Sequence, residues 1–285
     1  MQPQARPLIF FDVLGTLVYN PFFREIPAFF GLTHAELLRR KHPTSWIDFE
    51  MGRMSETEYF ARFFSDGSRF DEDAFRTCVA DAYRWIDGME SCLAEVQGAG
   101  NEVHTLSNYP VWYQTIEERL RLSRYLRWTF VSCETGVRKP ARNAFLLAAR
   151  QLGRLPAQCL LIDDCMQNCF AAEEAGMPAI QFFDACQLRH ELVCRGLIPF
   201  LISTRPHCGS DHKFEYRRRD PQGPRLPLPQ VERFDVAEVC IDRYRGELFF
   251  FSARRFESSR NREYPSLPQT PETSIYRCRG SSGRR

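Results

Sequence analysis

Several short apolar runs in the first two thirds of the chain end directly in a polar or charged residue. Residues 7–12 form a continuous apolar run that ends in Asp12, the pattern of a central strand buried on both faces. Similar runs precede Ser107 and the pair Asp163-Asp164. Parallel strands present their carboxyl ends at one edge of a sheet, where open α/β sheets bind their ligands. The sequence therefore predicts a parallel sheet with its functional groups along one edge.

The segments between these runs have helical patterns, so that strand and helix alternate. We expect strands at 7–12, 102–106, 128–132, 159–162 and 179–183, and helices at 89–96, 110–122, 141–152 and 168–175. Pro110 suits the first turn of a helix, where its missing N–H would have no partner in any case. Gly153 and Gly176 are typical residues for the ends of the helices before them. Alternation with short links predicts an α/β fold with a doubly wound parallel sheet.

One segment after the first strand interrupts this alternation with a purely helical pattern. Ser55 and Glu58 have the spacing of a capping box at a helix start. Aromatic residues follow at helical steps: Tyr59, Phe60, Phe63 and Phe64. Residues 71–84 are predicted as a further helix. We therefore expect a small all-helical cap at 20–85, a sheet domain formed by 7–19 and 86–204, and a tail at 205–285.

The predicted tail differs from the rest of the chain in charge and pattern. Residues 205–285 hold 17 Lys and Arg against 11 Asp and Glu, whereas the preceding residues hold 21 against 25. Five prolines fall within 205–230, and no periodic apolar face emerges there, so we expect a largely disordered basic extension. Residues 236–251 could form one hairpin, with Arg245-Gly246 at its turn. A faulty gene model is an alternative explanation of the tail. So is a nucleic-acid arm, but one arginine triplet is too little to predict such a partner.

Composition limits the class of protein. The chain has 285 residues, of which 44% are hydrophobic and 26% charged, so it can bury a sizeable globular core. No apolar run approaches the roughly 18 to 20 residues that span a bilayer, and no membrane partner is expected. The 11 cysteines are scattered without a CxxC pair. Cys165 and Cys169 lie four apart but have no nearby histidine, so reduced thiols are favoured over a zinc site.

The polar groups at the predicted sheet edge make up a phosphate-handling site. A carboxylate held in line with phosphorus and shielded from water can accept a phosphoryl group, and Asp12 is placed for this role. Asp163 and Asp164 offer the hard oxygens that Mg²⁺ prefers, although Asp164 could instead pair with Lys139. Lys139 would neutralise Asp12 and the phosphate, and the Ser107 hydroxyl would bind the phosphoryl group. Taken singly, Asp12 or Ser107 could each be a helix cap.

These fragments, in this order, resemble the haloacid dehalogenase (HAD) superfamily of aspartyl-nucleophile hydrolases over roughly residues 7–204. The matching fragments are Phe10-Phe11-Asp12-Val13-Leu14-Gly15-Thr16, Leu106-Ser107-Asn108, Arg138-Lys139-Pro140 and Asp163-Asp164. The resemblance implies a HAD-like sheet with a helical cap and a Mg²⁺ cofactor. It implies metal ligands from Asp12, Asp163, Asp164 and the backbone carbonyl of Leu14. It also implies substrate or supporting contacts from Thr16, Ser107, Asn108, Lys139 and Asn168.

Leu14 departs from the pattern of this superfamily. Most of its phosphatases have a second aspartate at that position, which protonates the leaving oxygen and then activates water, and leucine can do neither. General acid–base help is worth about 10²–10⁴-fold, so a slow enzyme with an intact covalent step is expected. Haloacid dehalogenases also lack this acid, which leaves dehalogenation as an alternative. A metal-free dehalogenase, however, does not need the pair Asp163-Asp164.

A closer resemblance, continuous to about residue 200, is to the plant chloroplast flavin mononucleotide (FMN) hydrolases of this superfamily. It includes Asn20-Pro21-Phe22-Phe23, Trp46-Ile47-Asp48-Phe49-Glu50, Asn108-Tyr109-Pro110-Val111-Trp112-Tyr113 and Tyr125-Leu126-Arg127-Trp128-Thr129-Phe130. In that group an aspartate can occupy the position of Gly15, so this chain has neither acid. The resemblance implies a small-molecule phosphomonoester substrate, FMN or a related flavin-pathway phosphate. The competing hypothesis is a catalytically silent scaffold that binds a flavin or a protein partner.

The same resemblance carries expectations about the substrate ring, the location and the assembly. Trp46 and Phe49 lie three apart on one predicted helical face, and we expect them to stack on a flavin ring. The alternative is that the aromatic residues of the cap form its own core. A plastid location is implied, but no transit peptide is recognisable, so a cytoplasmic location stays the alternative. A homodimer is left open.

Overall fold

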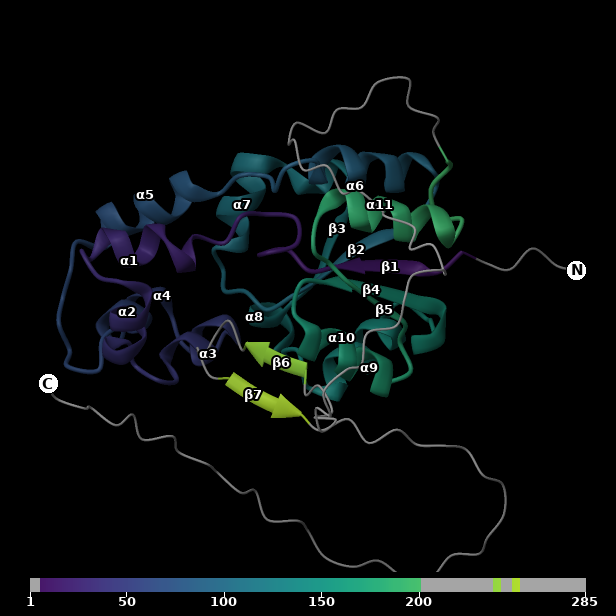
Figure 1. Cartoon of the computed structure of the whole chain (residues 1–285). Helices are drawn as coiled ribbons and strands as arrows, with labels where there is room; N and C mark the ends of the chain where they lie inside the picture. Colours follow the sequence, from purple (N-terminus) through teal and green to yellow (C-terminus); the bar gives the residue numbers. More distant parts are fainter. Residues whose placement is uncertain (1–5, 201–237, 242–247, 252–285) are drawn as a thin grey trace, which may run out of the picture. The chain divides into compact units, whose positions relative to one another are not determined.

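The computed structural model describes residues 6–200 and two tail segments, 238–241 and 248–251. Five parallel strands form one sheet: β1 (Leu8–Phe11), β2 (Val103–Ser107), β3 (Arg127–Val131), β4 (Cys159–Asp163) and β5 (Ala179–Gln181). Their order is β3-β2-β1-β4-β5, so β1 is central (Figure 1). Within it, Ile9 pairs with Val103 of β2 and Leu160 of β4. The predicted doubly wound parallel sheet is confirmed.

Helices cover both faces of the sheet. One face carries α6 (Met89–Gly98), α7 (Tyr113–Leu120) and α11 (Ala185–Cys194), and the other carries α9 (Arg142–Gln151) and α10 (Met166–Glu174) (Figure 1). Shorter helices lie in the connections: η2 (Leu122–Arg124), α8 (Ser132–Thr135) and η3 (Pro156–Gln158). Alternate residues of β1 serve the two faces, because Ile9 and Phe11 pack into one hydrophobic cluster and Leu8 and Phe10 into the other.

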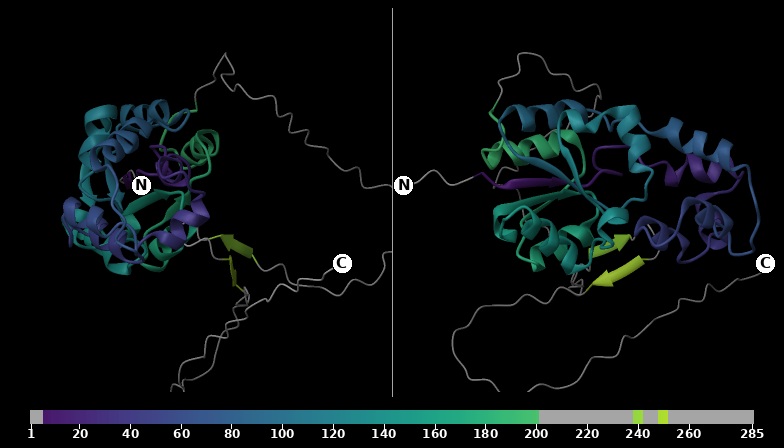
Figure 2. Two further views of the ribbon diagram at one scale, coloured as in Figure 1. Left: turned by 90° about the vertical axis from the view of Figure 1, so that its left-hand side faces the viewer. Right: turned by 180° about the vertical axis from the view of Figure 1, so that it is seen from behind.

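The named elements between β1 and α6 are all helical. They are η1 (Pro21–Phe23), α1 (Glu25–Phe29), α2 (His34–Arg40), α3 (Ser45–Glu50), α4 (Glu56–Ala61) and α5 (Glu72–Ala82). Ser55 and Glu58 form the predicted capping box at the start of α4. The chain enters and leaves this cap side by side, since the Tyr19 N–H donates to the Arg84 carbonyl. Figures 1 and 2 show the cap beyond the carboxyl ends of the strands.

The interior of the cap is built from aromatic side chains. Five of them are at most 1% exposed: Phe49, Tyr59, Phe60, Phe63 and Phe75. Trp112, at the start of α7 in the sheet domain, lies within 6.2 Å, ring centre to ring centre, of Phe49, Tyr59, Phe60 and Phe75. The same hydrophobic cluster continues to Ile9 and Phe11 of β1. Cap and sheet therefore share one core on this face.

The described part of the tail consists of two strands. β6 (Glu238–Ile241) and β7 (Leu248–Phe251) pair antiparallel, with Glu238 opposite Phe251. These are the two strands of the hairpin predicted at 236–251. Its predicted turn at Arg245-Gly246, and the predicted disorder of the rest of the tail, lie outside the described residues. No helix among the described residues has the length and hydropathy of a membrane span.

Candidate active site

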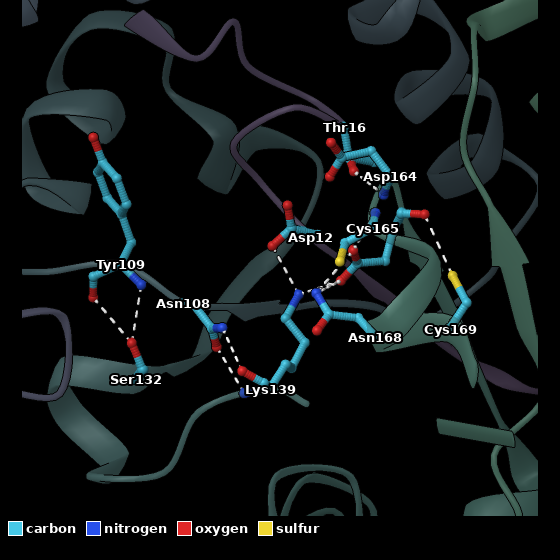
Figure 3. Close-up of polar contacts among 11 residues, drawn as sticks. Asp12, Thr16, Asn108, Tyr109, Ser132, Lys139, Asp164, Cys165, Asn168 and Cys169 are labelled. Atoms are coloured by element: carbon cyan, nitrogen blue, oxygen red, sulfur yellow. Dashed lines mark hydrogen bonds and ion pairs between the residues drawn. The ribbon is translucent and has the colours of Figure 1, made fainter. Parts of the chain in front are cut away.

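The polar groups predicted at the sheet edge converge in the folded chain. Asp163 ends β4. Figure 3 shows Asp12, which follows β1, next to Lys139, which comes from the connection between α8 and α9. The Lys139 Nζ lies 2.8 Å from Asp12 Oδ1 and 2.5 Å from Asp163 Oδ2. Lys139 is 1% exposed and Asp163 is fully buried. One buried ammonium therefore joins two carboxylates from neighbouring strands.

Asp163 is oriented by the first turn of α10. The Cys165 N–H donates to its Oδ1 at 2.9 Å, and the Asn168 amide lies 3.1 Å from both carboxylate oxygens. The Cys169 thiol donates to the Asp163 carbonyl at 3.4 Å. Asn168 thus has the predicted supporting role. The cysteines of the described part are free thiols, and Cys165 and Cys169 belong to no metal-ligand cluster among these residues.

Asp164 is held by the loop that follows Asp12. The Asp164 N–H donates to the Thr16 hydroxyl at 3.1 Å. Thr16 is fully buried, and its hydroxyl supports Asp164 in this structure; its predicted contact with a substrate stays a prediction. Gly15 has a φ of +95°, and a Cβ at that position would lie 2.6 Å from Asp164 Oδ2. Only glycine fits this close approach without strain, so the loop is packed directly against the Asp164 carboxylate.

Three carboxylates are arranged as a metal site. Asp12, Asp163 and Asp164 each offer an oxygen within 4.8 Å of the others, and no other such group occurs among the described residues. Mg²⁺ holds oxygen ligands at about 2.0–2.1 Å, so opposite ligands are roughly 4 Å apart and a small closure would seat the ion. The donors are the hard oxygens that Mg²⁺ prefers, and they fit it. The backbone carbonyl of Leu14 stays a predicted ligand.

The charges of the site are unbalanced without a cation. Burial raises the pKa of Asp12 to about 7, and the nearby Asp163 and Asp164 charges act against the partial relief given by Lys139. Burial alone would lower the pKa of Lys139, but Asp12 and Asp163 hold it above its ordinary value. Lys139 therefore stays charged, yet one ammonium faces three carboxylates. A divalent cation bound by these oxygens would remove the excess negative charge and return Asp12 to its ionised form.

Ser107 and Asn108 have different roles at the end of β2. Ser107 is 3% exposed, and its hydroxyl has no hydrogen-bond partner among the described residues. A buried hydroxyl without a partner is costly, which indicates that a ligand completes it. The Asn108 amide is already committed, because it donates to the Lys139 carbonyl and accepts from the Lys139 N–H, both at 2.8 Å. Asn108 therefore holds the lysine, where we had predicted substrate contact.

The predicted ring-binding residues of the cap lie in different surroundings. Phe49 is 1% exposed and stacks on Tyr59 with ring centres 4.6 Å apart, so our prediction that it binds a flavin ring is wrong for this structure. Trp46 is partly exposed, with the Tyr109 ring 5.8 Å away. The Lys41 ammonium lies 4.9 Å from the Trp46 ring centre. Trp46 stays a predicted contact, with only part of its ring available.

The structure also brings in residues that the sequence analysis had not selected. Ser132, which begins α8, accepts from the Tyr109 N–H at 2.9 Å and donates to the Glu50 carbonyl. Glu50 is 2% exposed, although it is charged and lies in the cap. Its sequence signal was an acid at the end of a short helix whose other buried residues are Ser45 and Phe49. That signal is weak because exposed glutamates at helix ends are common.

Comparison with known proteins identifies relatives of the chain. The family model for haloacid dehalogenase-like hydrolases matches residues 7–176. The chain is 41% identical over 191 residues to flavin mononucleotide hydrolase 1, chloroplastic, of Arabidopsis thaliana, covering 67% of this chain and 78% of that protein. It is 24% identical over 157 residues to sesquiterpene phosphatase astK of Aspergillus oryzae, covering 52% and 77%.

Solved structures share the fold. A HAD family enzyme of Bacteroides thetaiotaomicron, crystallised with magnesium and inorganic phosphate, has a TM-score of 0.52 at 16% identity, covering 63% of this chain and 96% of that one. A HAD-like family hydrolase of Porphyromonas gingivalis has a TM-score of 0.52 at 21% identity, covering 67% and 98%. At these identities the likeness shows the fold alone. With the family match over more than half of the chain and the 41% identity, it follows that this chain belongs to the haloacid dehalogenase-like hydrolases.

Proposed function

We propose that the protein is a Mg²⁺-dependent phosphomonoesterase that acts on FMN or a related flavin-pathway phosphate. The observation that carries this proposal is the group of three carboxylates around Lys139, next to the unpartnered hydroxyl of Ser107. Carboxylates that bind a divalent cation, a fixed ammonium and a free hydroxyl are the parts that phosphoryl transfer needs. The FMN substrate rests on the relative of that name, which is 41% identical.

In the proposed reaction Asp12 is the nucleophile. One oxygen of its carboxylate attacks the phosphorus, and the bond from phosphorus to the ester oxygen breaks, which leaves an acyl phosphate on Asp12. Water then attacks that phosphorus, so that inorganic phosphate leaves and the Asp12 carboxylate is restored. Lys139 stays charged throughout and offsets the negative charge of Asp12 and the phosphate. Bound Mg²⁺ would supply further positive charge to the phosphate oxygens.

The leaving oxygen receives no proton from the position that usually supplies it. Leu14 is 6% exposed and packs in the hydrophobic cluster shared by cap and sheet. An acid at position 15, as in some relatives, would have to fit a backbone with a φ of +95° against the Asp164 carboxylate. We therefore propose that the leaving alkoxide takes its proton from water. The expected enzyme is slow, and its rate depends strongly on the pKa of the leaving group.

Two other functions compete with this one. A haloacid dehalogenase also lacks the second acid, but it has no use for a cation site, and three carboxylates within 4.8 Å of one another favour phosphoryl transfer. A silent scaffold would keep the fold and bind a flavin without turnover. Leu14 in place of an acid would suit such a scaffold, but the ion pair between Lys139 and Asp12 supports turnover.

Phosphate release from a panel of phosphomonoesters tests the proposal. The panel includes FMN and nitrophenyl phosphate, each assayed with Mg²⁺ and with EDTA. We expect release in Mg²⁺ and its loss in EDTA, with FMN among the better substrates by kcat/KM. Halide release from a 2-haloacid in EDTA would establish the dehalogenase instead. Tight FMN binding with no phosphate release from any ester would identify the scaffold.

A plastid location is proposed on the name of the Arabidopsis relative alone, which is a chloroplastic protein. Imaging a fluorescent fusion of the complete gene product tests it. Signal within plastids is the expected result, and uniform cytoplasmic signal would overturn it.

A further inference from the structure

The cap contacts the sheet domain directly beside the segment that carries Lys139. The end of α3 lies against α8, and the Ser132 hydroxyl donates to the Glu50 carbonyl. Gly52 has a φ of +68°, and any side chain there would collide with the Cys133 carbonyl oxygen. The backbones of Gly52 and Cys133 are therefore in direct contact, with no room for a side chain between them. This α3–α8 contact is separate from the two chain connections near residues 17–19 and 84–86 that join the cap to the sheet.

An ion pair between the buried Glu50 and the partly exposed Arg138 lies at the α3–α8 contact. The Glu50 Oε1 is 2.6 Å from the Arg138 Nε, and Glu50 is 2% exposed. At this distance the two opposite charges form a salt bridge. Burial raises the pKa of Glu50, and Arg138 acts against that shift. Apolar side chains of similar volume often stabilise a fold as well as a buried ion pair does. Stability alone is therefore a weak reason for this pair.

The place of Arg138 in the chain indicates another reason. It is the residue before Lys139, whose N–H and carbonyl are both bonded to the Asn108 amide. Asn108 holds the lysine backbone from the sheet side, and Glu50 holds the preceding residue from the cap side. The Lys139 ammonium has to reach Asp12 and Asp163 together, at 2.8 and 2.5 Å. Such a double contact tolerates little displacement of the backbone that carries it.

We propose that Glu50 is a positioning residue for Lys139. Its salt bridge from the cap fixes Arg138, and Arg138 in turn fixes the segment that presents the lysine to Asp12 and to the phosphate. A cap that is not seated on α8 therefore leaves the lysine misplaced, so that seating and catalysis are coupled. The expected loss of kcat rests on the proposed phosphomonoesterase function. The expected displacement of the Lys139 segment does not.

Kinetics of matched variants test the proposal. Glu50→Gln and Arg138→Gln should each lower kcat by about 10-fold to 100-fold, because small misplacements of catalytic groups cost that much. The loss should be equal for FMN and nitrophenyl phosphate, with KM nearly unchanged. The double variant should be no slower than the slower single variant, because each single change already removes the same contact, between Glu50 and Arg138. Arg138→Lys keeps the charge and should recover part of the rate.

The control is Asp48→Asn, the same kind of change on the same helix. Asp48 lies 3.9 Å from Arg53, another residue of the cap, in a partly exposed pair, so the kcat of this variant should stay at the wild-type value. A Glu50→Gln enzyme as fast as this control would overturn the proposal. So would losses that multiply in the double variant, or a rise in KM for FMN alone, which would indicate direct substrate contact.

Hydrogen–deuterium exchange without substrate separates this inference from the proposed function. Glu50→Gln should raise exchange in peptides covering 45–52 and also 132–139, while the strands stay protected. If the wild type hydrolyses no ester, the proposed function fails and the exchange result still decides the coupling. If exchange at 132–139 does not change, the coupling fails whatever the activity. Should Glu50→Gln not fold, Arg138→Lys and Arg138→Gln are compared in the same way.

Discussion

The carboxyl edge of the sheet and the interior of the cap are both buried, but different forces hold them. At the edge, the buried charges of Lys139 and Asp163 are tolerated because each bonds to the other and to further polar groups. In the cap, Phe49 and Tyr59 are held by contact with many rings, none of which is indispensable. A charged group in the interior has few acceptable partners, so its role can be inferred from a sequence motif. An aromatic ring can pack against many different partners, so a motif does not reveal its role.

Replacing Asp12, the proposed nucleophile, is the change with the largest expected effect, and it tests only the carboxyl edge of the sheet. Asp12→Asn should lower phosphate release by about 10³-fold or more, because an amide cannot accept the phosphoryl group. The pKa of Asp12 rises from 3.8 to about 7 on folding, so in EDTA the wild-type fold should lose stability as pH rises between these values. The variant should lack that loss. Urea unfolding of the wild type and the variant at pH 4.5 and 7.5 measures this change in stability. In the phosphate-release assay, a variant that kept most of its activity would refute the covalent mechanism.

Truncating a buried ring of the cap should lower the stability of the fold without removing a contact to the substrate. Phe49→Ala should lower the free energy of unfolding by about 3–5 kcal/mol, the usual cost of a cavity left by phenylalanine. The matched control is Phe170→Ala, because Phe170 is 61% exposed and its loss should change stability by less than about 0.5 kcal/mol. The folded fraction of Phe49→Ala should hydrolyse FMN and nitrophenyl phosphate with unchanged KM. A rise in KM for FMN only would restore Phe49 as a ring-binding residue.

An aspartate at position 14 would restore the acid that most phosphatases of this superfamily have there. Leu14 belongs to the apolar core but lies two residues from Asp12, so this change affects both the core and the sheet edge. Leu14→Asp should speed hydrolysis of FMN, an alkyl ester, by about 10-fold relative to Leu14→Asn. Nitrophenyl phosphate should gain less, because its leaving group needs little protonation. The same change should cost stability, since Leu14 is 6% exposed. Equal gains on both esters would mean that another group already serves as the acid.

Trp46 lies on the border between the two regions. Trp46→Ala should raise KM for FMN by about 2-fold to 10-fold, which corresponds to one aromatic contact of about 0.5–1.5 kcal/mol. KM for nitrophenyl phosphate should stay within the error of the assay, because its small ring does not extend into the cap. If KM for both esters rises alike, Trp46 belongs to the core of the cap with Phe49.

The smallest effect is expected from removing the tail. Truncation after about residue 205 should leave the melting temperature within a few degrees and kcat unchanged, because a proline-rich basic segment has little to bury. Scanning calorimetry of the two lengths measures this. A large drop would show that the strands β6 and β7 pack on the catalytic unit.

Much of the fold followed from the sequence because strand patterns are local. All five strands were predicted. Asp12 follows β1 and Asp163 ends β4, and the apolar runs of these two strands are typical of buried parallel strands. The helix α11 was missed, although Asp184 caps its start by accepting from the Gln187 N–H. Its inward residues are spaced among charged ones, which gives a weak pattern.

The site was predicted less evenly, for a physical reason. Lys139 and Asp163 were selected from motifs and the structure brings them together, whereas Phe49 was predicted to bind a ring and lies in the core of the cap. A spacing of three residues indicates that two side chains share a helical face, but it does not say what that face meets. For α3 it meets Tyr59 and Trp112. The Glu50 contact with Arg138 joins residues far apart in sequence, which no local pattern reveals.

The hydrophobic cluster that runs from β1 into the cap has a consequence for how the protein melts and evolves. Because Trp112 of the sheet domain packs among Phe49, Tyr59 and Phe60, the cap has no complete interior of its own. Calorimetry should therefore show one cooperative transition for both, not an early melting of the cap. For the same reason recombination cannot exchange this cap as a module. A foreign cap would have to arrive with a new residue at position 112, so the two parts have to change together.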